Sequence, residues 1–315
     1  MRCKMPSNVI HYYFAKTVKE ELNSDIKAII DNNSQAFLLG AQGPDPLFYL
    51  KFEKEPLNQL GEYIHKATDA HLIFQASADY AKSRNSGTII AFLLGQLCHY
   101  AADAVIHPYV YYKEKDMLKF YPANAHENMH VILESAFDYI CMRDNMKVNT
   151  VFHKSYKNLN IQAAARKEIA VYYSKLIAPM FNIELSPEKV MGAIKLMRVF
   201  LRFCDDTTGI KYLFIRALEI IARAPQCVSP FVRPRREKIN EDWMNLNRAS
   251  FAKYHNEPEL TNETFAELLL RAEKDAVKLI VNFYDYISKD IALDKQLYYR
   301  NYSGELLEQS AKIAE

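Results

Sequence analysis

The sequence centres on the stretch Gly95-Gln-Leu-Cys-His99-Tyr-Ala-Ala-Asp103-Ala-Val-Ile-His107-Pro108. In a helix, residues four apart are displaced by about 40° around the axis and about 6 Å along it. His99, Asp103 and His107 therefore form one stripe on a helix whose other positions are largely apolar. The apolar run that begins at Thr88 predicts a buried helix ending near His107, because Pro108 disfavours its continuation.

The stripe has the composition of a metal site. A buried carboxylate between two imidazoles is costly unless a cation neutralises it, and neutral imidazole with carboxylate suits zinc. His99 and His107 are about 12 Å apart along the helix, too far to share one ion comfortably, whereas Asp103 between them can bridge two ions. The alternatives are a solvated polar stripe or hydrogen-bonded core histidines.

A second group of ligand-type residues lies in His126-Glu-Asn-Met-His130-Val-Ile-Leu-Glu134. His130 and Glu134 are one helical turn apart and can complete a site opened by His107. His126 lies one turn earlier, near the expected start of that helix, where it caps the helix or faces solvent.

Four further candidates stand outside these helices. His11 lies near the start of the first expected helix, and Asp45 lies in a loop between Pro44 and Pro46. His65 and His71 fall in the second expected helix. Six residues turn a helix about 120° beyond whole turns, so the two histidines do not both face one metal.

Helical periodicity continues along the chain, and no segment alternates long enough to predict a strand. Ser186-Pro187-Glu188 and Thr264-Phe-Ala-Glu267 are helix-start signals. A loop over 224–242 contains the basic run Arg233-Pro-Arg-Arg236. We expect one all-α, multi-helix domain over 1–315, with a metal-binding catalytic half at 1–150 and a supporting half at 151–315. The expected helices cover 9–22, 57–82, 88–107, 124–143, 160–182, 186–204, 209–223 and 263–288.

Composition excludes several classes. Half of the 315 residues are apolar and only 20 are Gly or Pro, which argues against a fibrous or disordered chain. The net charge of +2 gives no strong nucleic-acid signal.

The run 88–106 is long enough to span a bilayer but contains His99 and Asp103, so we expect a buried helix and no transmembrane segment. The N-terminus lacks the apolar core of a secretion signal, and the five cysteines form no CxxC pair, so we expect reduced thiols and a cytoplasmic location.

Taken in order, these residues resemble the zinc-dependent phospholipase C family over roughly 8–140. The resemblance rests on His11, Phe37-Leu-Leu-Gly-Ala-Gln-Gly-Pro-Asp45, a helical histidine, Gly95-x-x-x-His99-Tyr-x-x-Asp103-x-x-x-His107-Pro and His130-x-x-x-Glu134. It implies an all-α fold shared with zinc single-strand nucleases, and a phosphodiesterase that uses a metal-activated water. Choline-lipid enzymes of the family carry an aromatic directly after the loop aspartate, where this chain has Pro46, so the resemblance does not extend to choline specificity.

The resemblance also implies a ligand set for two or three zinc ions. Asp45, His65, His99 and Asp103 hold the first ion; His107, His130 and Glu134 hold the second; His11 and a bridging Asp103 hold the third. Asp103 sets the spacing of two ions, and Asp45 is a ligand or a base. The implied substrate is a phosphoester such as a phospholipid; its identity and the oligomeric state stay open.

Two other interpretations remain. Glu62-Tyr-Ile-His65 and Glu127-Asn-Met-His130 have the Glu-x-x-His spacing of ferritin-like di-iron bundles. The di-iron interpretation leaves the His99-Asp103-His107 stripe without a role. The other is a non-catalytic zinc-binding helical protein that binds partners through residues 233–236.

Overall fold

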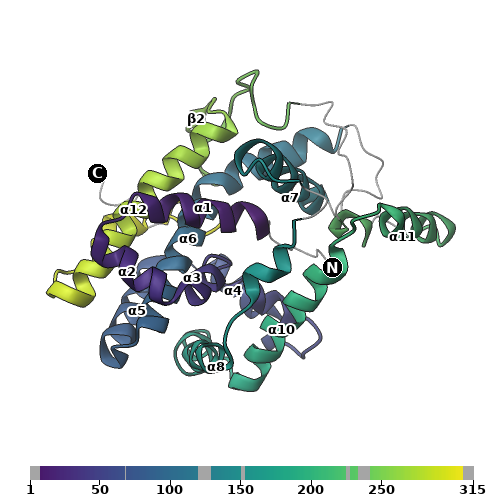
Figure 1. Ribbon diagram of the computed structural model, residues 1–315. Helices are drawn as coiled ribbons and strands as arrows, with labels where there is room; N and C mark the ends of the chain where they lie inside the picture. Colours follow the sequence, from purple (N-terminus) through teal and green to yellow (C-terminus); the bar gives the residue numbers. More distant parts are fainter. Residues whose placement is uncertain are drawn as a thin grey trace.

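The computed structural model describes residues 8–67, 69–119, 129–149, 153–224, 228–232 and 242–307, and these residues are mostly helical (Figure 1). The α-helices are α1 (Asn8–Glu20), α2 (Ser24–Asn32), α3 (Ser34–Gly40), α4 (Leu60–His65), α5 (Ala70–Arg84), α6 (Gly87–Met117), α7 (Met129–Ile140), α8 (Ala163–Tyr172), α9 (Ala178–Met180), α10 (Pro187–Cys204), α11 (Ile210–Ile221) and α12 (Phe265–Lys289). Short 3-10 or π segments are η1 (Asp45–Leu50), η2 (Leu57–Gln59), η4 (Cys141–Asn145), η5 (Ser155–Leu159), η6 (Tyr173–Ile177), η7 (Ser229–Phe231) and η8 (Lys295–Tyr298). Within the described ranges the sheet is one antiparallel pair, β1 (Phe251–Ala252) with β2 (Leu260–Thr261). The all-α prediction is confirmed.

Helix α6 forms the centre of the fold. All of its residues from Ile89 to Ile106 are buried, and α3 and α12 pack along it. Among the described residues it is the one helix long and apolar enough to cross a membrane, and its apolar window lies wholly inside the protein. The prediction of a buried helix here is confirmed.

The expected end of this helix at His107 is wrong, because α6 continues through Pro108 to Met117. A proline inside a helix leaves the carbonyl four residues earlier without its usual donor. That carbonyl belongs to Ala104, and it accepts a hydrogen bond from the Arg300 guanidinium at 3.3 Å. The free-energy cost of Pro108 in the helix is therefore reduced by Arg300, which lies almost two hundred positions away in the chain.

The single helix expected over 57–82 is also wrong. The chain forms η2, α4 and α5 there, with a break after His65. Asp69 caps α5 by accepting a hydrogen bond from the Leu72 N–H at 2.9 Å. Asp, a favoured N-cap residue, begins a new helix here instead of extending the old one.

The later helices follow the expectation closely. Ser186 caps α10, and Thr264 with Glu267 forms a capping box at the start of α12. The region 160–182 is divided by η6 into α8 and α9. Helix α7 is described from Met129, and His126 and the basic run 233–236 lie outside the described residues. So do residues 150–152, where the expected halves meet, although one hydrophobic core draws side chains from both sides of them.

The C-terminal segment (residues 298–307) returns to α6. The Tyr100 hydroxyl donates to the carbonyl of Arg300 at 2.6 Å, and the Arg300 guanidinium donates to Asp275 at 2.8 Å. Gly304 lies so close to Pro108 that a Cβ there would stand 2.5 Å from the proline ring. The C-terminal segment is thus fixed beside the histidine stripe.

Candidate metal centre

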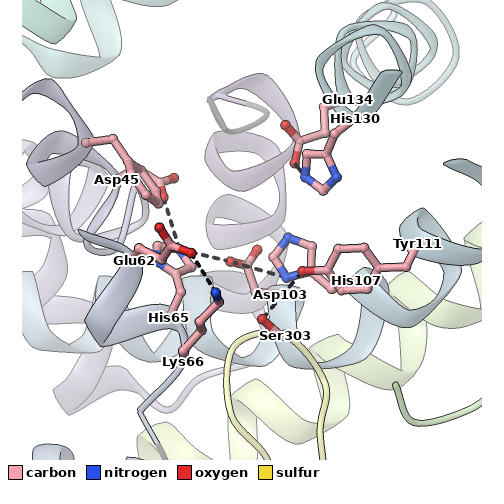
Figure 2. A pocket seen from close by; sticks show the side chains of 11 residues that line it. Asp45, Glu62, His65, Lys66, Asp103, His107, Tyr111, His130, Glu134 and Ser303 are labelled. Atoms are coloured by element: carbon pink, nitrogen blue, oxygen red, sulfur yellow. Dashed lines mark hydrogen bonds and ion pairs between the residues drawn. The ribbon is translucent and has the colours of Figure 1, made fainter. Parts of the chain in front are cut away.

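The predicted ligands gather around one pocket (Figure 2). Its lining includes Asp45, His65, Asp103, His107, His130 and Glu134. The two remaining predicted ligands, His11 and His99, stack beside them with ring centroids 4.2 Å apart. Helix α6 supplies three of the eight side chains, α7 supplies two, and α1, η1 and α4 supply one each. Segments from five parts of the chain therefore meet at one place.

The first cluster (His11, Asp45, His65, His99 and Asp103) is organised around Asp103. Its carboxylate lies 3.0 Å from His99 Nε2, 3.3 Å from His11 Nε2 and 3.7 Å from His65 Nε2. Asp45 Oδ1 lies 3.3 Å from His65 Nε2 and 3.8 Å from His99 Nε2. Two sets of three ligand atoms in this cluster fall within 4.8 Å of one another, a spacing that can hold a cation.

The second cluster (His107, His130 and Glu134) lies farther along α6. His130 Nε2 is 3.2 Å from Glu134 Oε1, and the His107 and His130 rings are 5.9 Å apart. The ligand atoms of all three residues lie within 4.8 Å of one another. Asp103 connects the clusters, since its Oδ2 is 3.9 Å from His107 Nδ1.

Backbone carbonyls orient three of the imidazoles. His65 Nδ1 donates to the carbonyl of Gly61 at 2.7 Å, and His99 Nδ1 donates to that of Ala41 at 3.3 Å. His107 Nδ1 donates to the carbonyl of Tyr302 at 2.6 Å. Because Nδ1 is engaged as a donor, Nε2 is the nitrogen of each ring that is left to bind a metal ion.

The start of α1 is held in place by α7. The Asp138 carboxylate accepts hydrogen bonds from the N–H groups of Val9 and Ile10, at 3.1 and 2.9 Å. A carboxylate at a helix N-terminus satisfies free N–H groups and interacts favourably with the helix dipole. This anchor positions His11 one residue later.

Burial sets the protonation of two imidazoles. It lowers the pKa of His11 to about 3 and that of His107 to about 4. Both rings are therefore neutral at physiological pH, which is the form of histidine that binds metals. Burial also acts against the charge of Asp103, but the imidazole of His99 outweighs it and holds the pKa of the Asp103 carboxyl below its usual range.

The other two shifted imidazoles carry charge. Burial lowers the pKa of His99, but Asp103 and Asp45 outweigh it and raise that pKa to about 9. Glu134 and Glu114 likewise overcome burial and raise the pKa of His130 to about 9. Positive charge therefore stabilises the buried carboxylates. A bound metal ion would supply that charge in place of the protons on His99 and His130.

Buried polar atoms without partners indicate that a cation fits. Among the described residues, Oδ2 of Asp45, Nδ1 of His11 and Oε2 of Glu134 are buried and make no hydrogen bond. Such atoms are costly unless something binds them. They are all of the types that zinc prefers, imidazole nitrogen and carboxylate oxygen.

The structure separates His65 from His71. His65 lies in the first cluster, whereas His71, on α5, packs its ring 5.6 Å from the ring of Tyr298. The break between α4 and α5 is what turns the two side chains apart. Glu62, of the Glu-x-x-His pair, lines the pocket with His65, but its counterpart Glu127 lies outside the described residues.

Two further residues of the pocket lining, Tyr111 and Ser303, and one neighbour of His130, Glu114, are not predicted from the sequence. Tyr111 stacks on His107 and donates a hydrogen bond to Ser303 at 3.4 Å, and Glu114 Oε2 lies 3.6 Å from His130 Nδ1. Tyr111 continues the four-residue spacing of the stripe, a signal hidden by the expected helix end at His107. Ser303 comes from the C-terminal segment and has no comparable signal.

Replacing Gly43 with alanine is expected to remove metal from the first cluster. Gly43 has φ +55°, and a Cβ there would lie 2.2 Å from the His99 ring. Left-handed backbone favours glycine, and the added methyl must displace the imidazole. Elemental analysis should find at least about one zinc fewer per chain. Gly192→Ala, where a Cβ meets nothing within 4 Å, should retain the wild-type content. A wild-type zinc content in Gly43→Ala would contradict the assignment of His99 as a metal ligand.

Comparison with known families agrees with this geometry. A family model described as zinc dependent phospholipase C matches residues 10–181, more than half of the chain. No curated protein and no solved structure matches the chain. The matched range contains all eight predicted ligands and ends before α10, α11, α12 and the C-terminal segment.

Proposed function

Because the chain belongs to the zinc-dependent phospholipase C family, we propose that it hydrolyses phosphodiesters, with a phospholipid as the substrate class. The observation that carries the proposal is the meeting of both clusters in one accessible pocket. A structural zinc site is closed by four protein ligands, whereas a catalytic one keeps a position open. Here the pocket reaches the surface at Lys66 and Glu62, which are paired at 2.6 Å and partly exposed.

Bound zinc supplies a water of lowered pKa and positive charge for the phosphoryl oxygens. Asp103, Asp45, His65 and His99 with His11 would hold the ions of the first cluster, two ions at most. His107, His130 and Glu134 would hold one more. Asp103 would serve more than one of these ligand groups, because its Oδ1 faces His11 and its Oδ2 faces His99.

The remaining lining residues bind and orient the substrate. The hydroxyl of Ser303 and the ammonium of Lys66 line the pocket and can donate hydrogen bonds to phosphoryl oxygens. The Tyr111 hydroxyl donates to Ser303 and so orients that hydroxyl. Phe48, also in the lining, packs its ring 5.0 Å from that of His65 and supports its orientation. Figure 2 shows Lys66, Ser303 and Tyr111 below and beside Asp103.

Metal removal tests the proposal. Chelation should reduce hydrolysis of a chromogenic phosphodiester to about one-hundredth or less, and added zinc should restore it, because the residues alone offer no comparable activation of water. Elemental analysis of the purified protein should find two or three zinc ions per chain. Iron in place of zinc would support the di-iron alternative.

A screen across lipid, nucleotide and generic phosphoesters then identifies the substrate class. Turnover of phospholipids above the other two classes is the expected result. Bound zinc with no turnover of any of the three would overturn the proposal in favour of the non-catalytic alternative.

A further inference from the structure

Helix α11 presents an apolar face to solvent. Figure 1 shows it projecting from the side of the molecule, beyond the end of α10. Six of its large apolar side chains are about half or more exposed: Ile210, Leu213, Phe214, Leu218, Ile220 and Ile221. At 100° per residue these positions cover an arc of about 160° on one side of the helix. Exposed apolar patches of this kind mark interaction sites.

The opposite side of α11 is fixed to the protein by polar contacts. Glu219 is buried and accepts hydrogen bonds from the N–H groups of Val228 and Ser229, at 2.8 and 2.9 Å, and from the Ser229 hydroxyl at 2.6 Å. At the start of the helix, Asp206 accepts hydrogen bonds from Gly209 and Tyr212. These contacts determine which face of α11 points outward.

The exposed charges in the stretch of chain that contains α11 have one sign. Within 195–224, all of which is described, the exposed charged side chains are Lys195, Arg198, Arg202 and Arg223. The acidic residues of the same stretch are Asp205, Asp206 and Glu219, and none of them is exposed. The stretch therefore combines an apolar helix face with exposed charges that are all basic, and these four residues are called its basic flanks.

We propose that α11 is a membrane-docking helix that lies in the interface of an anionic bilayer. An apolar face immersed at the acyl boundary, with Lys and Arg at headgroup level, is the arrangement by which interfacial helices bind anionic lipids. The basic flanks favour this occupant over a second copy of the chain, whose facing surface would carry the same positive charges. The inference does not depend on catalysis, since neither α11 nor its flanks contribute to the metal centre.

Vesicle co-sedimentation tests the docking helix. The wild-type chain is expected to partition onto phosphatidylserine-containing vesicles, and severalfold less onto pure phosphatidylcholine vesicles. The double variant Phe214→Ser/Ile221→Ser removes two central side chains of the face and should lower partitioning tenfold or more. Leu246→Ser/Leu260→Ser is the matched control: the two leucines are 74% and 67% exposed, comparable with 62% for Phe214 and 78% for Ile221, yet lie outside α11, so it should bind as wild type.

A spectroscopic readout supports the sedimentation. The chain has one tryptophan, Trp243, which is buried. In Phe214→Trp the added indole should shift its emission to shorter wavelength on adding anionic vesicles. Hydrolysis of a soluble chromogenic phosphodiester should be unchanged in all these variants, which separates a failure of docking from a failure of the proposed catalysis.

Two results would overturn the proposal. One is equal vesicle binding by wild type and Phe214→Ser/Ile221→Ser. The other is a wild-type protein that does not bind vesicles. If that protein sediments as a dimer and the double variant as a monomer, the apolar face of α11 is an interface between two copies of the chain.

Discussion

Replacing Asp103 with asparagine is expected to lower kcat/KM for a chromogenic phosphodiester at least about 10³-fold. The Asp103 carboxylate lies within 3.7 Å of three imidazoles of the first cluster and 3.9 Å from His107 in the second. Asparagine keeps the shape but removes the negative charge and one oxygen ligand. Elemental analysis should therefore also find at least about one zinc fewer per chain. Circular dichroism should show the wild-type helical content.

Two histidine variants provide the matched comparison for Asp103→Asn. His65→Ala should lose both zinc and activity, because His65 Nε2 faces Asp45 and Asp103. His71→Ala should retain both, because that ring packs on Tyr298. Unchanged hydrolysis in Asp103→Asn, or the reverse behaviour of the two histidines, would show that the first cluster is not the site of the chemistry.

Replacing Gly95 with alanine is expected to destabilise the protein by about 3 kcal/mol or more. A Cβ at Gly95 would lie 2.1 Å from the Phe37 carbonyl oxygen and 2.7 Å from the Ala41 nitrogen. These atoms belong to the backbone of α3 and its end, which cannot rotate away as a side chain can. Gly40 on α3 meets α6 in the same way, since its Cβ would lie 1.9 Å from the Phe92 carbonyl oxygen.

Thermal denaturation measures this effect, with an expected fall in the midpoint of about 5 °C or more. Gly192→Ala is the control, because this glycine lies inside α10 with open space around it. There alanine only gains helix propensity, so stability should rise by about 0.5–1 kcal/mol. An equal response of the two glycines would show that the close approach of α3 and α6 is not what Gly95 serves.

The sequence predicted the helices best where local signals were complete. The capping residues Ser186 and Thr264 marked the starts of α10 and α12. It failed at Pro108, where α6 continues and the carbonyl of Ala104, which the proline leaves without a donor, accepts a hydrogen bond from Arg300. That error also hid Tyr111, which lies one helical turn beyond His107 and lines the pocket.

In the candidate site, too, contacts within one helix could be predicted from the sequence and contacts between distant segments could not. Spacing alone grouped His130 with Glu134, and His99 with Asp103, because residues four apart on a helix lie on one face. Spacing on one continuous helix predicted that His65 and His71 point apart, whereas in the structure the break before Asp69 separates them and leaves only His65 in the first cluster. The carbonyl of Tyr302 that orients His107 left no trace in the sequence, because every residue carries one.

By itself, then, the order of residues determined the helical class, the kinds of ligand and their pairing within each helix, since these follow from periodicity and side-chain chemistry over a few turns. The tertiary structure decided which pairs from different helices meet and how α6 continues past its proline. It also decided which acidic groups turn inward beneath α11. These outcomes depend on contacts between residues far apart in the chain, whose energies no local pattern contains.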